Sequence, residues 1–381
     1  MDGGRVNPTV GIIGGGQLAR MTHQAAIDLG IDIVVLCQDA DAPAVRAGAQ
    51  HCPGRPDRLE DLVRLAERCD VVTVDHEKTP AELLRALERA GHRVAPGARA
   101  AEHGQDKALV RALAEQHGIS TAPWTCAETV DEITEFGSRH GWPLYLKLPT
   151  GGYDGRGVWR ASSPEKAAQV VAETQRRLLV EPAVAFRHEV SVLVVRSTRG
   201  ETVVYPPVET VQRDGQCHEV FVPTTLPVPR QSEAQHLAVL TANAIDLVGT
   251  MALELFVTAD GLLLNELAVR PHNSGHLTIE ACATSQFENH LRAVLGLPLG
   301  STELIVPAAA MVNLVGGPDG VDPFLGLSGA LAVPGASVHC YGKAARPRRK
   351  VGHVTATGAT VALARSTAAR AADRMSSEVA A

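Results

Sequence analysis

MALELFVTADGLLLNELA, the stretch from residue 251 to residue 268, decides the fold. Two short apolar runs flank Asp260-Gly261, and Asp-Gly between such runs is a strong signal for a β-hairpin. Folding back at this turn places Glu254 opposite Glu266, where Cβ atoms are about 5 Å apart and like charges are destabilising. The pair is therefore either solvated at the surface or bound to a cation. Magnesium is the natural cation, because it prefers carboxylate oxygen and often bridges to substrate phosphates.

The residues that follow the hairpin also point to an anionic ligand. The chain continues as NELAVRPHNSGH, from residue 265 to residue 276. Arg270, His272 and Asn273 supply a cation and hydrogen-bonding groups that suit a phosphate or a carboxylate. We therefore expect a reaction centre next to the glutamate pair.

Composition narrows the class of protein. A chain of 381 residues with 45% hydrophobic and 20% charged residues predicts a globular enzyme of two or three domains. A net charge of −6 and 3% aromatic residues argue against nucleic-acid binding. We expect no membrane span and no signal peptide, since the apolar runs are short. Seven scattered cysteines without CxxC spacing favour reduced thiols, and therefore a cytoplasmic enzyme.

The order of apolar and polar runs changes along the chain. Residues 9–95 alternate strand-like runs with amphipathic helical stretches, which is typical of a parallel sheet with covered faces. Residues 105–117 predict a further helix, and strands with glycine breaks begin near residue 143. Residues 276–295 look helical, and a smaller strand-rich region follows. The alanine- and arginine-rich tail, from about residue 364, is expected to fray.

A glycine-rich turn near the N-terminus allows two hypotheses. The segment from Gly14 to Ala19 follows a strand and satisfies the dinucleotide fingerprint G-x-G-x-x-A, with Asp39 about 20 residues further on. A nicotinamide-dependent oxidoreductase is one hypothesis, although no hydride-transfer site is evident downstream. The other is that a phosphate, sugar or small ring approaches the glycine backbone. Glu77 would face the same crevice, because parallel sheets bind ligands at the carboxyl ends of their strands.

Two lysines and a second glycine-rich segment predict a polyphosphate site. Residues 150–157 (TGGYDGRG) follow a strand that ends near Lys147. A glycine hairpin can cover phosphates with its amides, and a neighbouring lysine adds a point charge. Lys107, at the start of a helix, is a second cation that reaches the same region. The pattern is not a Walker loop, and most such hairpins are simple turns.

Two further segments are compatible with a nucleotide and with a phosphorylated substrate. Residues 178–184 (LLVEPAV), followed by Glu189, suit an inter-strand connector that bonds adenine while the carboxylate holds ribose; a plain strand with surface glutamates is the alternative. A basic cluster near the C-terminus favours a bound phosphate rather than nucleic acid, and a solvated loop is the alternative. Its members are Lys343, Arg346, Arg348, Arg349 and Lys350.

These segments occur in the order typical of ATP-grasp enzymes. The chain resembles the 5-(carboxyamino)imidazole ribonucleotide synthase family from about residue 9 to residue 355. The most specific pieces are GIIGGGQLARM, GGYDGRG, YGKAARPRRKVGH, and the segment that contains HNSGH and TSQFE. The resemblance implies an α/β protein with a Rossmann-like pre-ATP-grasp domain (1–104), an ATP-grasp α+β domain (105–300) and a small strand-rich C-terminal domain (301–365). A frayed tail (366–381) is expected to follow.

The resemblance also implies ATP and Mg²⁺ as ligands, and bicarbonate and 5-aminoimidazole ribonucleotide as substrates. The implied magnesium ligands are Glu254 and Glu266, with Asn265 beside them. The implied ATP contacts are Lys107, Lys147, Gly152, Tyr153, Asp154, Gly155, Arg156, Gly157, Glu181, Pro182, Ala183, Val184, Glu189 and Gln212. The implied ribonucleotide contacts are Gln17, Leu18, Glu77, Tyr153, Asp154, Arg156, Lys343, Arg349 and Lys350. Bicarbonate and the transferring phosphoryl group would face Arg270, His272, Asn273 and Ser274.

The implied reaction forms carboxyphosphate from bicarbonate and ATP and then carboxylates the ribonucleotide amine, in purine biosynthesis. Four departures from the family pattern stand out: Gln212 replaces a histidine, VDHEK surrounds Glu77, Pro182 lacks a backbone donor, and Val269 stands where proline is common. The magnesium ligands and phosphate-binding cations are retained, so we expect an active cytoplasmic homodimer. A formate-dependent glycinamide ribonucleotide transformylase and a silent nucleotide-binding protein are further alternatives.

Overall fold

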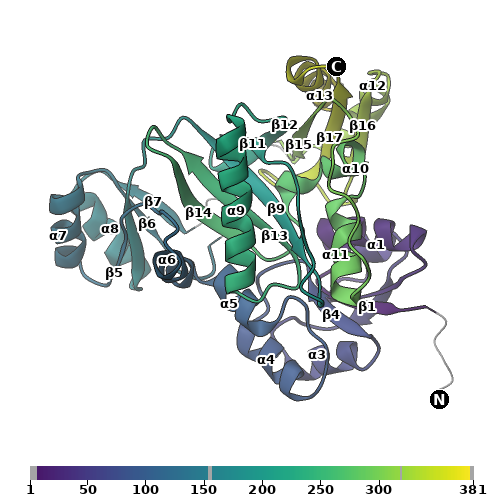
Figure 1. Cartoon of the computed structure of the whole chain (residues 1–381), viewed down its shortest axis with the longest axis horizontal. Coiled ribbons are helices and arrows are strands. Elements are labelled where there is room, and N and C mark those ends of the chain that lie inside the picture. Colours follow the sequence, from purple (N-terminus) through teal and green to yellow (C-terminus); the bar gives the residue numbers. More distant parts are fainter. Residues whose placement is uncertain (1–6, 153–156, 318–319, 378–381) are drawn as a thin grey trace.

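The computed structural model describes residues 7–152, 157–317 and 320–377. It contains three sheets with helices packed on them, and the N-terminal region has the expected parallel architecture (Figure 1). Its sheet has the order β3-β2-β1-β4 and pairs in parallel throughout. The elements are β1 (Thr9–Ile13), α1 (Gln17–Asp28), β2 (Asp32–Cys37), α2 (Pro43–Arg46), β3 (Gln50–Pro53), α3 (Leu59–Ala66), β4 (Val71–Val74) and α4 (Ala81–Arg89).

One expected strand of this region does not form. The run HRVA, at residues 92–95, is expected to be a strand, but Val94 makes only an isolated bridge to Val72. Pro96 follows two residues later and has no N–H to donate, so the ladder cannot continue. The chain instead enters α5 (Ala98–Gln105) and α6 (Lys107–Gln116), where Asp106 caps α6 by accepting from the Ala108 and Leu109 amides.

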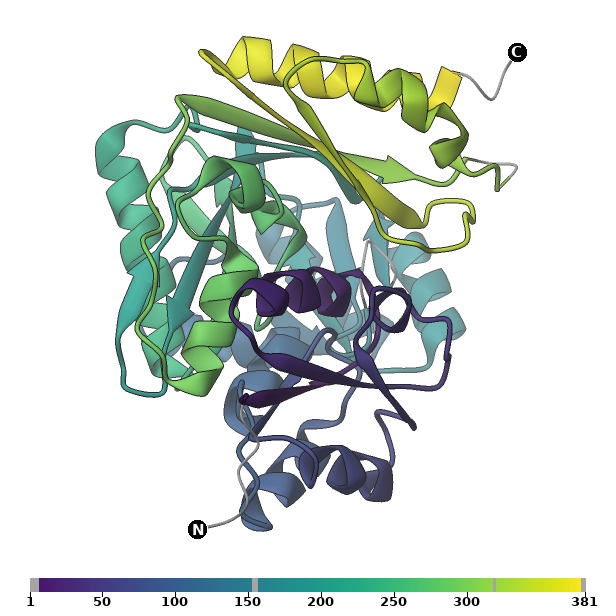
Figure 2. The ribbon, with the colours of Figure 1, turned by 90° about the vertical axis from the view of Figure 1, so that its right-hand side faces the viewer.

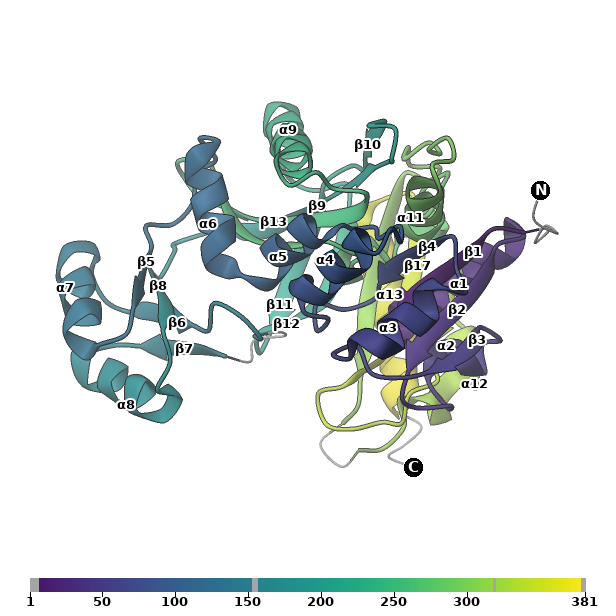
Figure 3. The same ribbon diagram turned by 90° about the horizontal axis from the view of Figure 1, so that it is seen from below.

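A small antiparallel sheet follows and projects at one end of the molecule, as Figures 1 and 3 show. Its strand order is β5-β8-β6-β7. Helices α7 and α8 pack on it around a buried core that includes Ile133, Phe136, Leu144 and Leu146. The elements are β5 (Thr125–Ala127), α7 (Val130–His140), β6 (Leu144–Lys147), β7 (Val158–Ala161), α8 (Pro164–Thr174) and β8 (Leu178–Pro182).

The third sheet has nine strands and joins the central and C-terminal regions. Its order is β14-β13-β9-β11-β12-β15-β17-β16, with β10 paired to β9. Because β12 pairs directly with β15, the backbone ladder continues across the sequence boundary expected near residue 300. Its strands are β9 (His188–Arg196), β10 (Thr202–Val204), β11 (Val208–Arg213), β12 (Gln216–Val222), β13 (Gly249–Val257), β14 (Leu262–Ala268), β15 (Ala308–Val315), β16 (Ala336–Cys340) and β17 (Lys350–Gly358).

The opening hairpin forms as predicted. Strands β13 and β14 pair antiparallel, with Glu254 opposite Glu266. The register shifts next to this pair, since Leu255 faces Leu264 and Asn265 is the additional residue of a β-bulge. The bulge bends β14 at the position where the two carboxylates meet. The predicted pair is therefore confirmed and lies at a local irregularity of the sheet.

Helices cover the nine-stranded sheet and connect it to the N-terminal region. The segment predicted as helical at 276–295 is divided into α10 and α11 by residues 282–285. Leu291 and Val294 of α11 share a buried cluster with Val10 and Ile12 of β1. The remaining elements are α9 (Val228–Ala244), η1 (Asn273–Gly275), α10 (Thr278–Ala281), α11 (Gln286–Leu295), η2 (Pro323–Gly326), α12 (Leu327–Leu331) and α13 (Val361–Ser377).

The expectation of a frayed tail at 366–381 is wrong for residues 366–377. These residues belong to α13, which lies along the C-terminal strands (Figure 2). Its buried face consists of Ala364, Ala368, Ala371, Ala372 and Met375. Small side chains at helical spacing bring the helix backbone close to the sheet, and burial of this stripe opposes fraying. In the described part of the chain, no helix is long and apolar enough to cross a membrane.

Candidate active site

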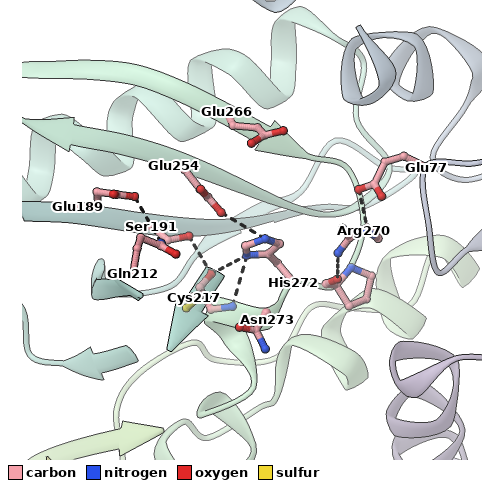
Figure 4. A network of polar contacts seen from close by, with 12 residues as sticks. Glu77, Glu189, Ser191, Gln212, Cys217, Glu254, Glu266, Arg270, His272 and Asn273 are labelled. Atoms are coloured by element: carbon pink, nitrogen blue, oxygen red, sulfur yellow. Dashed lines mark hydrogen bonds and ion pairs between the residues drawn. The ribbon is translucent and has the colours of Figure 1, made fainter. Parts of the chain in front are cut away.

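The glutamate pair forms the centre of a charged cluster (Figure 4). Desolvation raises the pKa of Glu254 to about 8, and the neighbouring Glu266 and Glu189 carboxylates add to the rise. Burial also opposes ionisation of Glu266, but the Lys107 ammonium outweighs it and holds the pKa of that carboxyl below its usual range. Lys107 Nζ lies 2.5 Å from Glu266 Oε1. Glu254 thus resists carrying a negative charge unless a cation arrives.

Two facing carboxylates of this kind suit magnesium. Within the described residues, no group of three or more His, Cys, Asp or Glu side chains is arranged to hold a metal ion. The protein therefore offers a pair of carboxylates rather than a full cage. Mg²⁺ is commonly held by one or two carboxylates, with water and substrate phosphates completing its coordination. Glu254 and Glu266 fit that mode of binding.

His272 faces the same pair from the loop after β14. Its Nε2 lies 3.3 Å from Glu254 Oε1, and its Nδ1 accepts from the Ser274 amide at 3.3 Å. The proton of the neutral ring is therefore placed on Nε2, towards the carboxylate. Burial holds the pKa of His272 well below its usual value, and the Arg270 and Lys350 charges lower it further. Ser274 Oγ continues the chain of contacts, at 2.9 Å from His272 Nδ1 and 2.8 Å from Ser191 Oγ.

Arg270 joins this loop to the N-terminal region. Its Nε lies 2.7 Å from Glu77 Oε1. Glu77 follows β4 at the carboxyl edge of the parallel sheet, where the sequence predicts a ligand-facing residue. The ion pair is partly exposed on both sides. It places the carboxyl edge of the parallel sheet, where Glu77 lies, next to the segment that follows Glu266.

The predicted phosphate-binding lysine is held by a buried carboxylate. Glu181 Oε2 lies 2.6 Å from Lys147 Nζ, and Glu181 Oε1 accepts from Arg111 Nε at 2.6 Å. Burial opposes ionisation of Glu181, but Lys147 and Arg111 together keep its pKa below the usual range. The Glu181 side chain, expected near adenine, thus fixes two cations. Nearby, Glu189 Oε2 accepts from Gln212 Nε2 at 3.4 Å, and burial raises the pKa of Glu189.

The basic C-terminal segment meets the glycine-rich N-terminal turn. Lys343 Nζ donates to Gln17 Oε1, which joins residues 326 positions apart in the chain. Leu18 is buried in a cluster with Met21, Phe287 and Tyr341. Arg349 donates to the Ala344 carbonyl, and burial lowers its pKa, with Arg346 adding to the effect. The structure therefore brings Gln17 next to Lys343, while their contact with the ribonucleotide stays a prediction.

The same glycine turn does not form a dinucleotide site. Asp75 Oδ2 accepts from the Gly16 amide at 2.7 Å, so a carboxylate caps the helix where a pyrophosphate would bind. A Cβ at Gly14 would lie 1.7 Å from Asp75 Oδ1, which explains the need for glycine there. The Asp39 carboxylate accepts from the Asp41 amide within its own turn. Two amides of the fingerprint, those of Gly14 and Gly16, are thus already bonded within the protein, which disfavours the oxidoreductase hypothesis.

Comparison with known proteins agrees with this geometry. The ATP-grasp domain family matches residues 112–287, the ribonucleotide synthetase preATP-grasp domain family matches residues 8–105, and the phosphoribosylaminoimidazole carboxylase C-terminal domain family matches residues 309–367. The N5-carboxyaminoimidazole ribonucleotide synthase of Mycobacterium tuberculosis is 44% identical over 94% of this chain and 85% of its own length. The chain belongs to the N5-carboxyaminoimidazole ribonucleotide synthase family of ATP-grasp enzymes.

Solved structures of N5-carboxyaminoimidazole ribonucleotide synthases have the same architecture. The synthetase from Thermus thermophilus is 38% identical, with a TM-score of 0.87 over 95% of this chain and 97% of that one. The synthase from Aspergillus clavatus, in complex with ADP and 5-aminoimidazole ribonucleotide, is 34% identical. Its TM-score is 0.89, over 97% of this chain and 99% of that one. The predicted fold class is thereby confirmed.

The structure describes only some of the predicted site residues of this ATP-grasp enzyme. Tyr153, Asp154, Gly155 and Arg156 lie outside the described residues, and only Gly152 and Gly157 mark the ends of the predicted phosphate-covering hairpin. The side-chain amide of Asn273, predicted to face bicarbonate, is instead paired with that of Asn313 at 2.7 and 2.8 Å.

Four residues of the site were missed by sequence reasoning: Arg111, Ser191, Gln286 and Asn313. Each acts through a contact that no local motif encodes. Gln286 belongs to the TSQFE segment already noted as characteristic of the family, and this was the one available signal. The other three lie on ordinary helix and strand positions. Their roles depend on tertiary pairing rather than on spacing in the sequence.

Proposed function

We propose that this enzyme carboxylates the exocyclic amine of 5-aminoimidazole ribonucleotide at the expense of ATP and bicarbonate. The observation that carries the proposal is the position of the Glu254–Glu266 pair. On one side it meets Lys107, and on the other it meets His272. A nucleotide-binding region and an acceptor-binding region thus adjoin the same two carboxylates.

The nucleotide would lie between the small sheet and the hairpin. Lys107 and Lys147 supply positive charge for its phosphates, and bound magnesium would neutralise further charge during phosphoryl transfer. Pro182 has no backbone donor, and the Ala183 amide donates to the Pro143 carbonyl at 3.0 Å. The Val184 amide is then the donor that residues 182–184 offer to adenine. Glu189 and Gln212 lie on adjacent strands and suit the ribose hydroxyls.

The chemistry consists of two transfers. A bicarbonate oxygen attacks the γ-phosphorus of ATP, the bond to the bridging oxygen breaks, and ADP leaves. The ribonucleotide amine then bonds to the carbon of carboxyphosphate, phosphate leaves with the C–O electron pair, and the amine loses a proton. Arg270 would stabilise the negative charge of the transferring phosphoryl group. The neutral His272 ring would hold the Glu254 carboxylate in place through its Nε2 proton. Gln17, Lys343, Arg349 and Lys350 would bind the ribonucleotide and its 5′-phosphate.

An ADP-release assay tests the proposal. We expect ADP release that requires both bicarbonate and 5-aminoimidazole ribonucleotide. Replacing Glu266→Gln removes a magnesium ligand and should lower product formation by about 100-fold or more. The exposed Glu135→Gln variant should behave like the parent enzyme. ADP release that instead requires formate and glycinamide ribonucleotide would assign a transformylase activity, and tight ATP binding without turnover would indicate a silent nucleotide-binding protein.

We extend the proposal to the assembly and the compartment of the enzyme. The family resemblance supports a homodimer, and the scattered cysteines support a reducing cytoplasm. Sedimentation equilibrium should give about twice the chain mass of 40.2 kDa. A monomeric mass at micromolar concentration would contradict the homodimer.

A further inference from the structure

The loop that carries His272 has little regular structure of its own. We define the reaction loop as residues 270–276; it contains one short helical turn, η1, at Asn273–Gly275. Its internal hydrogen bonds are short-range: Gly275 N–H donates to the His272 carbonyl at 3.0 Å, Ser274 N–H to His272 Nδ1 at 3.3 Å, and Arg270 Nη1 to the Pro271 carbonyl at 3.1 Å. A segment of this kind does not fix its own position. Groups outside the loop must therefore fix where its backbone lies, and the His272 ring moves with that backbone.

Gln286 provides the first of these external contacts. It is the first residue of α11 and is 0% exposed. Its Oε1 accepts from the His272 amide at 2.8 Å, and its Nε2 donates to the His272 carbonyl at 2.7 Å. The side chain thus pairs with the His272 backbone as a neighbouring strand would. At Gly275 a Cβ would come within 2.5 Å of Gln286 Oε1, so the loop is closely packed against this amide.

Asn313 provides the second contact, from the C-terminal region. It lies on β15 and is 4% exposed. Its amide pairs reciprocally with that of Asn273, the residue next to His272, and it also donates to the Cys217 carbonyl at 3.0 Å. Both functional groups of the Asn273 amide are thereby occupied. Asn313 anchors the loop to β12 and β15 at the same time.

We propose that Gln286 and Asn313 are positioning residues that hold the reaction loop so that His272 faces the Glu254–Glu266 pair. Gln286 Nε2 also lies 3.3 Å from His276 Nδ1, at the end of the loop, and Asn313 also holds the Cys217 carbonyl on β12, so both amides tie the loop to fixed elements. Gln286 bonds the His272 backbone and Asn313 bonds the next residue, so the His272 ring has few orientations available. A small displacement of a reacting group can lower the rate by about two orders of magnitude. This inference rests on the proposed carboxylation.

The test compares Gln286→Leu and Asn313→Leu with Asn289→Leu. Asn289 is also buried on α11, but its amide bonds to Tyr205 and Gly300, away from the loop. We expect the first two variants to lower kcat for the carboxylated product by about 10- to 100-fold, with little change in KM for ATP. They should also release more ADP than product, because a misplaced loop leaves carboxyphosphate open to water. Asn289→Leu should lower Tm while ADP and product stay equal.

A milder change at Gln286 keeps the test decisive if Gln286→Leu does not fold. Gln286→Glu retains the acceptor for the His272 amide and loses the donor to its carbonyl, so an intermediate excess of ADP is expected. Equal amounts of ADP and product in Gln286→Glu and in the folded Asn313 variant would overturn the inference. If the parent enzyme itself shows no bicarbonate- and ribonucleotide-dependent ADP release, the proposed function fails and the inference fails with it.

Discussion

Glu181 illustrates how one buried residue sets the position of a cation that is predicted to bind phosphate. Its carboxylate lies between Arg111 and Lys147, and the Arg111 side chain is only 2% exposed. A carboxylate this deep is tolerated because both of its oxygens are engaged by cations. With Arg111 present, Glu181 shares its charge between two partners. The charge of Lys147 is then only partly neutralised by Glu181, so its ammonium group remains available to a phosphate.

Removing Arg111 should therefore affect both stability and nucleotide binding. We expect Arg111→Leu to lower the free energy of unfolding by about 3 kcal/mol, since one oxygen of a buried carboxylate loses its partner. The KM for ATP should rise, because Lys147 is drawn more strongly to Glu181. The matched control is Arg139→Leu in the exposed Arg139–Glu135 pair, where a change within about 0.5 kcal/mol is expected. Urea denaturation and ADP-release kinetics measure the two effects, and equal behaviour of the two variants would refute the argument.

At the level of elements, the alanine-rich helix α13 completes the C-terminal core. Ala368 is 0% exposed in a cluster with residues of β15 and β17, whereas Ala369 is exposed. Ala368→Asp should bury an unpaired carboxylate and lower the free energy of unfolding by several kcal/mol, on the order of 3. Ala369→Asp carries the same helix-propensity cost, about 0.7 kcal/mol at most, without the burial. Similar denaturation midpoints for the two variants would show that α13 does not pack as described.

The helix and the hairpin show which elements the sequence could predict. The β13–β14 hairpin is specified locally, by an Asp-Gly turn between two apolar runs, so the pairing of Glu254 with Glu266 was predictable. Helix α13 is specified by alanines at helical spacing, which carry a weak hydrophobic signal and resemble a solvated tail. The contacts of Gln286 and Asn313 join residues far apart in the chain and cannot be derived from spacing. The order of motifs, rather than any single one, allowed the family to be predicted.

At the level of the whole molecule, a buried histidine joins the N-terminal sheet to the central one. His290 on α11 accepts from the Thr250 amide through Nδ1 at 3.1 Å, and its Nε2 lies 2.8 Å from Thr73 Oγ1. Because Nδ1 accepts, the ring proton is placed on Nε2 and is donated to Thr73 on β4. A Cβ at Gly249 would lie 2.9 Å from this ring, so β13 and α11 approach each other closely here. The neutral ring therefore satisfies both sides of the junction.

Acid should weaken this junction in a predictable range. Burial lowers the pKa of His290 from 6.5 to about 4. The unfolded chain takes up the proton first, so the contribution of His290 to stability is complete above pH 6.5. It decreases as the pH falls from 6.5 to 4 and is lost below that range, by about 3 kcal/mol in all.

Denaturation curves across this pH range separate His290 from the other buried histidines. His290→Gln should be less stable than the parent at pH 7.5, because glutamine cannot satisfy both Thr73 and Thr250 in the same geometry. Its stability should fall less steeply between pH 6.5 and pH 4, since the titrating ring is absent. His236→Gln, at an exposed position on α9, should keep the parent slope. A parent slope retained in His290→Gln would mean that the junction does not depend on a neutral ring, and that the acid sensitivity arises from the histidines of the reaction loop and the C-terminal sheet.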